Sequence, residues 1–223
     1  MPYIEIQNLT KTFKKHKVLD DISLSCEQNT ICGFVGVNGS GKTMLFRAIC
    51  GLIRPDSGTV TVNGKVIGKD LSSPEDLGVI IENAGLWSEY SGFDNLKMLT
   101  RIGKKVSDEE IKNTIARVGL DPADKRPIRK YSLGMKQRIV FAQAIMEQPA
   151  LLVLDEPTNA LDEDGVALFR QILLEEKARG ATILISSHNR EDIAVLCDQV
   201  FHLRDGRLCE EPIKEKGAEK NDL

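Results

Sequence analysis

The sequence of 223 residues contains no run of 18 consecutive apolar residues, and its first segment, MPYIEIQNLTKTF, lacks the hydrophobic core of a secretory signal. These absences argue against a membrane-spanning helix and predict that the protein stays in the cytosol. The five cysteines are scattered and form no C-x-x-C pair. Their odd number and spacing argue against a zinc site and a disulfide framework, so we expect reduced cysteines that serve packing.

The net charge of −3 shows no excess of basic residues, which surfaces for nucleic acid or anionic lipid usually need. The bulk charge gives no sign of such partners and is otherwise uninformative about partners; we expect no nucleic-acid partner. The hydrophobic content of 41% and the charged content of 28% are ordinary for a globular protein. A chain of this length suits one large domain, or one core that carries an inserted lobe.

The most informative segment is the octet GVNGSGKT at residues 36–43, which fits the phosphate-binding pattern G-x-x-x-x-G-K-[ST] at every specified position. Gly39 and Gly41 allow a tight turn whose backbone N–H groups point into one cavity and surround phosphate oxygens. Lys42 adds a positive charge, and Thr43 offers a hydroxyl group to Mg²⁺. The octet therefore predicts binding of a nucleoside triphosphate with Mg²⁺; an ordinary glycine turn is the alternative.

A strand before the octet and a helix after it are the setting that this motif requires. The residues ICGFVG at 31–36 form a short apolar run. The segment TMLFRAICGLI that follows has apolar side chains at helical spacing, namely Leu45, Phe46, Ile49, Leu52 and Ile53. We therefore expect a helix whose positive dipole end faces the phosphates.

Hydrophobic patterns divide the rest of the chain. Residues 2–36 read as strands, and Asn63 and Gly64 between β-branched residues predict a two-residue hairpin. Residues 93–117 have helical spacing. The apolar runs at 151–157 and 181–188 predict strands of a parallel sheet, joined by a crossover helix.

These patterns predict an α/β fold with a parallel core, an antiparallel β lobe and an inserted helical lobe. We expect one domain at residues 1–209, with the helical lobe at about 83–147. The segment at 210–223 is charged and short of apolar residues, so we expect a mobile tail.

Two acidic residues follow the apolar run at 151–154. Asp155 lies at the predicted carboxyl end of a buried strand, where parallel α/β sheets bind ligands, so its carboxylate can hold Mg²⁺. We expect Glu156 to point to the opposite side of the strand, as a base that orients and polarises the attacking water. An apolar run closed by Asp-Glu could by itself be a simple strand end.

In their order along the chain, these motifs resemble those of the nucleotide-binding subunit of ATP-binding cassette (ABC) transporters, and the resemblance spans about residues 3–209. The counterparts are the octet for the Walker A loop, LLVLDEP at 151–157 for the Walker B strand, NALD at 159–162 for the D-loop, and His188 for the switch histidine. YSLGMKQR at 131–138 resembles the signature loop LSGGQ, with Leu133 and Met135 in place of Gly and Gln. Phe13 occupies the place of the aromatic residue that stacks on adenine.

The resemblance implies a P-loop NTPase core of the RecA-like kind and an ATPase that closes, in its ATP state, as a head-to-tail homodimer or heterodimer. It implies polytopic membrane permease subunits on other chains, which would hold the cassettes at the cytoplasmic, inner face of the cell membrane. The implied ATP-binding residues are Phe13, Gly36, Asn38, Gly39, Ser40, Gly41, Lys42, Thr43, Met44, Ser132 and Gly134; the implied metal-binding residues are Thr43, Glu82 and Asp155; and the implied catalytic residues are Lys42, Glu156 and His188.

Three of these residues also have simpler explanations. Ser132 and the backbone N–H groups near Gly134 precede a helical run, so they form a helix N-terminus that could face the γ-phosphate of ATP held by a second subunit. An ordinary helix cap is the alternative for Ser132. His188 could be a structural histidine at a strand end, and Phe13 could be a core residue.

The main departure from the family pattern is Glu82, which follows LGVII where members usually carry a glutamine that senses Mg²⁺ and water. With SLGMKQR, this acid resembles the branch that exports bacitracin-like or lantibiotic peptides and confers self-immunity. Trp87, Tyr90 and Phe93 follow it as aromatic anchors suited to docking a partner. A loop carboxylate on the surface is the alternative for Glu82.

Two other function classes lack their sequence signals. A cassette ATPase that acts on DNA or the ribosome would normally carry a long coiled-coil insertion, a zinc module or a second cassette, and the sequence contains none of these. A GTP-dependent switch would need an N-K-x-D motif, which is absent. We therefore expect an ATPase that drives transport.

Overall fold

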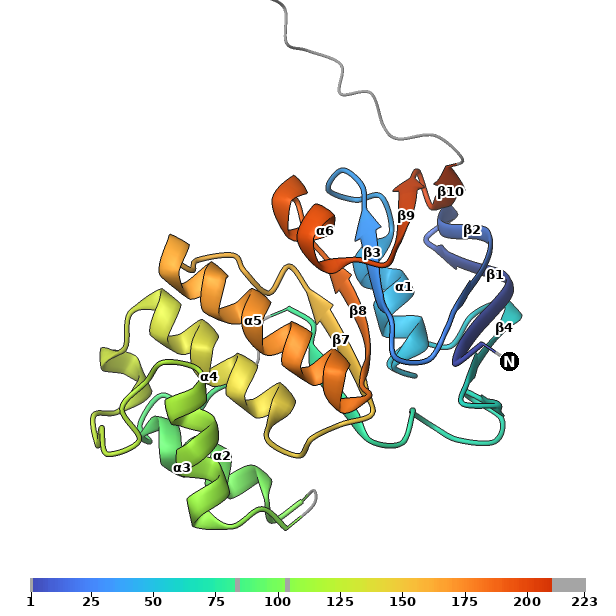
Figure 1. Cartoon of the computed structure of the whole chain (residues 1–223). Helices are drawn as coiled ribbons and strands as arrows, with labels where there is room; N and C mark the ends of the chain where they lie inside the picture. Colours follow the sequence, from blue (N-terminus) through green and yellow to red (C-terminus); the bar gives the residue numbers. More distant parts are fainter. Residues whose placement is uncertain (1, 83–84, 103–104, 210–223) are drawn as a thin grey trace, which may run out of the picture.

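A computed structural model describes residues 2–82, 85–102 and 105–209 (Figure 1). Its centre is a six-stranded sheet with the strand order β10-β9-β3-β8-β7-β6. The strands that pair in parallel are β3 (Ile31–Val35), β6 (Leu77–Ile80), β7 (Leu151–Asp155), β8 (Thr182–Ser186) and β9 (Gln199–Arg204). The short strand β10 (Arg207–Cys209) pairs antiparallel with β9.

Strands β7 and β8 are covered on both faces: all of their residues except Asp155 are buried, and most of them are apolar. Leu152 and Leu154 of β7 pack in the hydrophobic cluster that contains helices α4 (Leu133–Ile145) and α5 (Glu163–Arg179). Leu151 and Val153 pack in a second cluster with helix α1 (Lys42–Ile49). The alternation of side chains along one strand thus joins two cores, and the predicted parallel core is confirmed.

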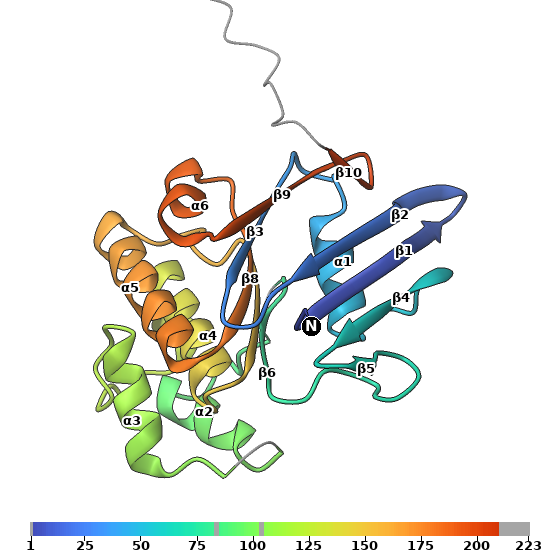
Figure 2. The ribbon, with the colours of Figure 1, turned by 45° about the vertical axis from the view of Figure 1, so that its right-hand side comes forward.

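A second sheet, with the order β2-β1-β4-β5, is antiparallel and lies on the α1 side of the molecule (Figure 2). Its strands are β1 (Ile4–Phe13), β2 (His16–Cys26), β4 (Ser57–Val62) and β5 (Lys65–Val66). Asn63 and Gly64 connect β4 to β5 with φ angles of 47° and 75°. Both angles are positive, as a type I′ hairpin turn requires, so the predicted hairpin is confirmed.

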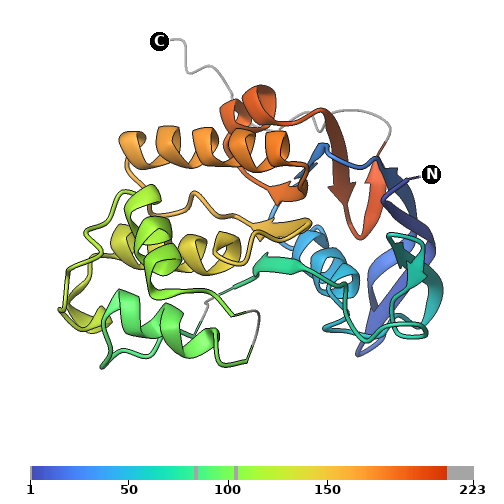
Figure 3. The same cartoon turned by 60° about the horizontal axis from the view of Figure 1, so that its bottom comes forward.

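Helices α2 (Gly92–Leu99) and α3 (Asp108–Arg117) lie with α4 at the end of the molecule opposite the antiparallel sheet (Figure 3). The helical stretch predicted at 93–117 is therefore two helices. Ser107 and Glu110 form a capping box that starts α3 as a separate helix. The remaining short elements are the 3₁₀ helix η1 (Ile128–Lys130) and helix α6 (Arg190–Leu196).

Two expectations about side chains need correction. Helix α1 ends at Ile49, and Leu52, predicted on its apolar face, is 62% exposed. Gly51 has a φ of 75°, which breaks the helical course before Leu52. Phe93 packs against the buried helical cluster instead of serving as an exposed anchor, whereas Trp87 and Tyr90 are 44% and 49% exposed.

The domain boundaries at 209 and at 83–147 stay predictions, and the predicted tail at 210–223 lies outside the described residues. Within the part of the chain that the structure describes, no helix is long and apolar enough to cross a membrane.

Candidate active site

The predicted phosphate loop connects β3 to α1 and wraps the start of the helix. A Cβ atom at Gly36 would lie 2.4 Å from the carbonyl oxygen of Leu203, and one at Gly41 would lie 2.8 Å from the carbonyl oxygen of Val18. Gly41 also has a φ of 110°. Neither position accepts a side chain in this backbone, which explains why the loop uses glycine at both.

Lys42 folds back over this loop. Its Nζ atom donates to the carbonyl oxygen of Gly36 at 2.7 Å and to that of Val37 at 3.5 Å, and only 6% of the side chain is exposed. The loop borders a cavity of about 250 Å³. The residues that line it are Val18, Asn38, Gly39, Ser40, Gly41, Lys42, Thr43, Met44, Asp155 and Glu156. Val18 was not predicted to lie here, because an apolar residue in a strand such as β2 does not indicate a binding site.

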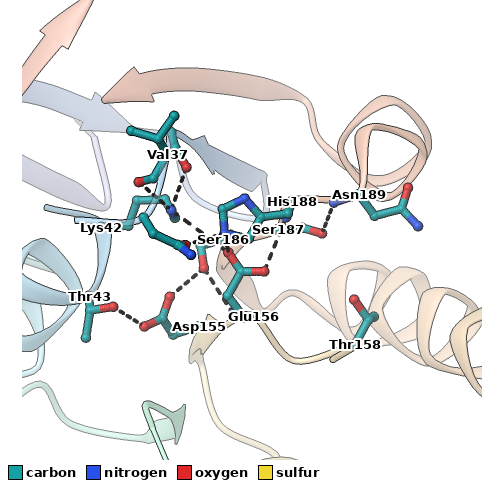
Figure 4. Close-up of polar contacts among 12 residues, drawn as sticks. Val37, Lys42, Thr43, Asp155, Glu156, Thr158, Ser186, Ser187, His188 and Asn189 are labelled. Carbon is teal, nitrogen blue, oxygen red and sulfur yellow. Dashed lines mark hydrogen bonds and ion pairs between the residues drawn. The ribbon is translucent and has the colours of Figure 1, made fainter. Parts of the chain in front are cut away.

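Thr43 and Asp155 are brought into direct contact at the floor of the site (Figure 4). The Thr43 hydroxyl donates to Oδ2 of Asp155 at 2.5 Å, and the Ser186 hydroxyl donates to Oδ1 at 2.5 Å. Ser186 ends β8, the neighbour of β7. Sequence reasoning missed Ser186, although it lies at the carboxyl end of a predicted parallel strand, where such sheets bind ligands.

Glu156 lies on the same side as Asp155, and the prediction that it points to the opposite side is wrong. Strand β7 ends at Asp155, and Glu156 has a φ of 49°, so the alternation of a strand no longer applies. Its backbone N–H donates to the Ser186 hydroxyl at 3.0 Å. Both acids consequently line one cavity.

The Glu156 carboxylate lies between two cationic or donor groups. Its Oε1 is 4.0 Å from Nζ of Lys42 and 3.1 Å from Nε2 of His188, and its Oε2 accepts from the His188 backbone N–H at 3.2 Å. Oε1 is buried and has no aligned hydrogen-bond donor among the described residues. A buried acceptor of this kind needs a water or ligand donor.

His188 follows β8 and reaches the phosphate loop. Its Nε2 lies 2.9 Å from Oδ1 of Asn38, and the side chain is 48% exposed. The structure thus gathers the predicted residues Asn38, Lys42, Glu156 and His188 at one place (Figure 4 labels Lys42, Glu156 and His188).

A buried carboxylate beneath the site ties its loops together. Asp192 in α6 is fully buried and accepts from the hydroxyls of Thr158 and Ser187, each at 3.0 Å, and from Nε of Arg170 at 2.8 Å. Thr158 follows the Glu156 segment, and Ser187 precedes His188. Sequence reasoning missed this network because an acid in the first turn of a helix normally indicates a solvated surface.

Helix α4 is joined to the loop after Glu156. Nε2 of Gln137 donates to the carbonyl oxygen of Pro157 at 2.8 Å, and Arg138 pairs with Asp162 at 3.1 Å. Asp162 caps α5. Its hydrogen bond from the Gly165 backbone, with a further one from Arg138, holds the pKa of the Asp162 carboxyl below its ordinary value.

Ser132 and Gly134 lie apart from the cavity. Ser132 is the N-cap of α4 and its hydroxyl accepts from the Met135 backbone N–H at 3.2 Å. Neither it nor Gly134 is among the described residues that line the cavity. Ser132 and Gly134 therefore lie at a helix N-terminus, as predicted. Within one chain, this N-terminus does not reach the cavity at the phosphate loop.

Phe13 and Glu82 also lie outside the lining of the cavity. Phe13 ends β1, is 44% exposed, and has Nζ of Lys11 at 5.2 Å from its ring centroid. Glu82, predicted beside the metal, has its Oε2 at 2.6 Å from the Arg47 guanidinium on α1. Its φ of 57° turns the chain at this point.

Comparison with known proteins agrees with this geometry. Residues 19–159 match the family described as ABC transporter. An uncharacterized ABC transporter ATP-binding protein of Bacillus subtilis, YybJ, is 54% identical over 205 residues, which cover 92% of this chain and 94% of YybJ. SrtF of Streptococcus pyogenes, a lantibiotic transport ATP-binding protein, is 35% identical over 206 residues, which cover 92% of this chain and 88% of SrtF.

A solved structure of the ATP binding subunit of an ABC transporter superposes with a TM-score of 0.82 at 25% identity, covering 92% of this chain and 88% of that one. The fold class predicted from the sequence is thereby confirmed, and SrtF lies in the branch that the sequence resembles. The phosphate loop, the paired acids and these similarities lead to one conclusion: the chain belongs to the ABC transporter family and is one of its ATP-binding, ATP-hydrolysing subunits.

Proposed function

We propose that this chain hydrolyses MgATP to drive export of a peptide antibiotic or a similar compound through separate membrane subunits. The observation that carries the catalytic part is the position of Glu156, whose buried Oε1 lies between Lys42 and His188 without an aligned donor among the described residues. An acceptor held there can take a hydrogen bond from the attacking water.

The other site residues have separate roles in this proposal. The backbone N–H groups of the phosphate loop and the Lys42 ammonium bind the β- and γ-phosphate oxygens. Glu156 orients and polarises the water, and Nε2–H of His188 donates to the terminal phosphate. Phe13 stacks on the adenine ring.

Thr43 and Asp155 would hold Mg²⁺, which supplies neutralisation of the charge on the phosphate oxygens. Their oxygen atoms suit this ion, since Mg²⁺ in such sites takes few protein ligands besides phosphate and water. In the described residues, no group of three or more His, Cys, Asp or Glu side chains could hold a metal by itself.

The family acts through paired cassettes, and we propose that Ser132 and Gly134 of one subunit complete the site of another. Their position at the N-terminus of α4, away from the cavity of their own chain, supports a site shared across a homodimer or heterodimer. Closure would bring the helix N-terminus to the γ-phosphate of the partner subunit's ATP.

The transport part rests on the similarity to SrtF and on Glu82 at the glutamine position. We propose that polytopic permease subunits hold the chain at the inner face of the cell membrane. The exposed aromatic side chains of Trp87 and Tyr90 are suited to packing against such a partner.

The experiment is copurification from detergent-extracted membranes of the native host, followed by ATPase assays and growth assays with bacitracin and lantibiotics. We expect a polytopic membrane protein to copurify, and deletion of the chain to lower resistance to at least one peptide. Copurification with ribosomes or DNA instead would overturn the transport proposal. An isolated chain that neither binds nor hydrolyses MgATP would overturn the catalytic part.

A further inference from the structure

Asn38 is placed so that its side chain can set the orientation of the switch histidine. The residue lies in a turn of the phosphate loop that is closed by the Ser40 backbone N–H donating to the Val37 carbonyl at 3.1 Å. Its Oδ1 lies 2.9 Å from Nε2 of His188. A phosphate loop binds phosphate mainly with its backbone N–H groups. Phosphate binding therefore does not account for the contact that the Asn38 side chain makes.

The contact fixes where the imidazole proton lies. Nε2 of His188 faces two oxygen atoms, Oδ1 of Asn38 at 2.9 Å and Oε1 of Glu156 at 3.1 Å. An ionised carboxylate only accepts hydrogen bonds. Both contacts are therefore favourable only when Nε2 carries a proton, and the amide oxygen of Asn38 then accepts it.

The alignment of the two contacts differs. The Asn38 contact has hydrogen-bond geometry, whereas Oε1 of Glu156 has no hydrogen-bond donor among the described residues despite its short distance to Nε2. Because 48% of the His188 side chain is exposed, little packing holds the ring in place. Within the part of the chain that the structure describes, Asn38 supplies the ring's one aligned hydrogen bond.

We infer that Asn38 is a positioning residue that acts through His188. Without nucleotide, Asn38 accepts the Nε2 proton and keeps this donor off Oε1 of Glu156. When ATP is bound, the terminal phosphate takes over this proton from Asn38, and Oε1 stays free to accept from the attacking water. Without Asn38, the ring turns to Glu156 and occupies the base. This inference rests on the proposed ATP hydrolysis. It gives the Asn38 side chain a role of its own, in addition to the phosphate binding by the backbone N–H groups of the loop.

Kinetics of purified protein with MgATP test the role of Asn38. Asn38→Leu keeps the approximate size of the side chain but removes the acceptor. We expect kcat to fall about 5- to 20-fold, as for loss of one hydrogen bond, while KM for ATP stays within about twofold. In a His188→Ala background, Asn38→Leu should cause no further loss. A raised KM with unchanged kcat, or an equal loss in both backgrounds, would overturn the inference.

A spectroscopic measurement tests the contact without hydrolysis. The chain has three histidines, so ¹⁵N-histidine labelling produces few imidazole signals, and His188→Ala assigns the one that matters. Without nucleotide, we expect one sharp His188 ring signal in the wild type and in Asn38→Asp, which retains an acceptor oxygen. Asn38→Leu should shift and broaden it. An unchanged signal in Asn38→Leu would overturn the inference, even if the wild type hydrolyses ATP normally. A wild type without ATPase activity would instead count against the proposed function.

Discussion

The ammonium Nζ of Lys42 lies 4.0 Å from Oε1 of Glu156, and both side chains are largely buried, with 6% and 19% of their surface exposed. The cation of the phosphate loop and the proposed base thus face each other across one cavity. Because their charges compensate, a change in either residue alters the charge balance that the phosphates meet. The two residues nevertheless have different proposed roles, so their variants should fail in different ways.

Glu156→Gln should leave ATP binding intact and lower turnover by roughly 10² to 10⁴, the range for loss of a positioned base. Removal of the negative charge should also favour the ATP-bound dimer, because the carboxylate repels the terminal phosphate. Phosphate release and gel filtration with ATP measure the two effects. Glu109→Gln, an exposed acid in the first turn of α3, is the matched control. Near-normal hydrolysis by Glu156→Gln would refute its role as base.

Lys42→Ala should weaken MgATP binding itself, because it removes the side-chain cation that the loop presents to the β- and γ-phosphates. Phe13→Ala should weaken binding less, by about 1 to 3 kcal/mol, by analogy with the loss of one base–aromatic stacking contact. Phe13 is 44% exposed, so its truncation should not disturb the core. Isothermal titration calorimetry measures both affinities. Unchanged affinity in both variants would show that the proposed pocket is wrong.

Ser132→Arg should abolish hydrolysis while each single subunit still binds ATP, because the bulky cation would block the surface that completes the partner's site. The variant also loses the cap of α4, which costs about 1 kcal/mol of stability. Ser132→Ala is the matched control, since it loses the cap without adding bulk.

A mixture of Ser132→Arg and Lys42→Ala subunits tests the shared site directly. Each mixed dimer should contain at most one intact composite site. Its ATPase activity, measured against equal amounts of wild type, should therefore stay below the wild-type value. Full wild-type activity in the mixture would refute the shared geometry.

The features that the sequence predicts well are encoded locally. The octet at 36–43 specifies its own turn through Gly39 and Gly41, whose φ angles of 79° and 110° favour glycine. Asn63 and Gly64 likewise specify a tight hairpin through their own positive φ angles. The apolar runs of β7 and β8 require burial on both faces, which a parallel sheet between helices provides.

The features that the sequence does not predict depend on contacts between distant segments or on unusual backbone angles. The positive φ of Glu156 brings its carboxylate to the cavity, and glutamate, unlike glycine or asparagine, is not a residue type that indicates such an angle. The contact of Asn38 with His188 joins residues 150 positions apart. The pairing of Glu82 with Arg47 likewise arises only once α1 and the end of β6 are packed together.

That last pair bears on how hydrolysis is coupled to transport. The Arg47 guanidinium lies 2.6 Å from the Glu82 carboxylate, and the side chains are 32% and 60% exposed. An ion pair this exposed contributes at most about 1 kcal/mol to stability. Variants at Glu82 should therefore fold normally, and Arg47→Ala is the matched variant that frees the carboxylate without removing it.

We propose that the Glu82 carboxylate tunes the coupling of ATP hydrolysis to the membrane subunits, because it is an acid at the glutamine position of the family and precedes the exposed Trp87 and Tyr90. A carboxylate accepts hydrogen bonds but, unlike an amide, donates none while ionised.

Glu82→Gln should keep the fold and the ATP affinity, with a modest change in hydrolysis. Glu82→Ala should lose partner-dependent transport or peptide resistance more than basal hydrolysis. The measurement sets the ATPase activity of the isolated subunit beside transport by the reconstituted complex. Unchanged transport in Glu82→Ala would show that this residue is an ordinary loop carboxylate. Glu82 would then no longer support the proposal of peptide export.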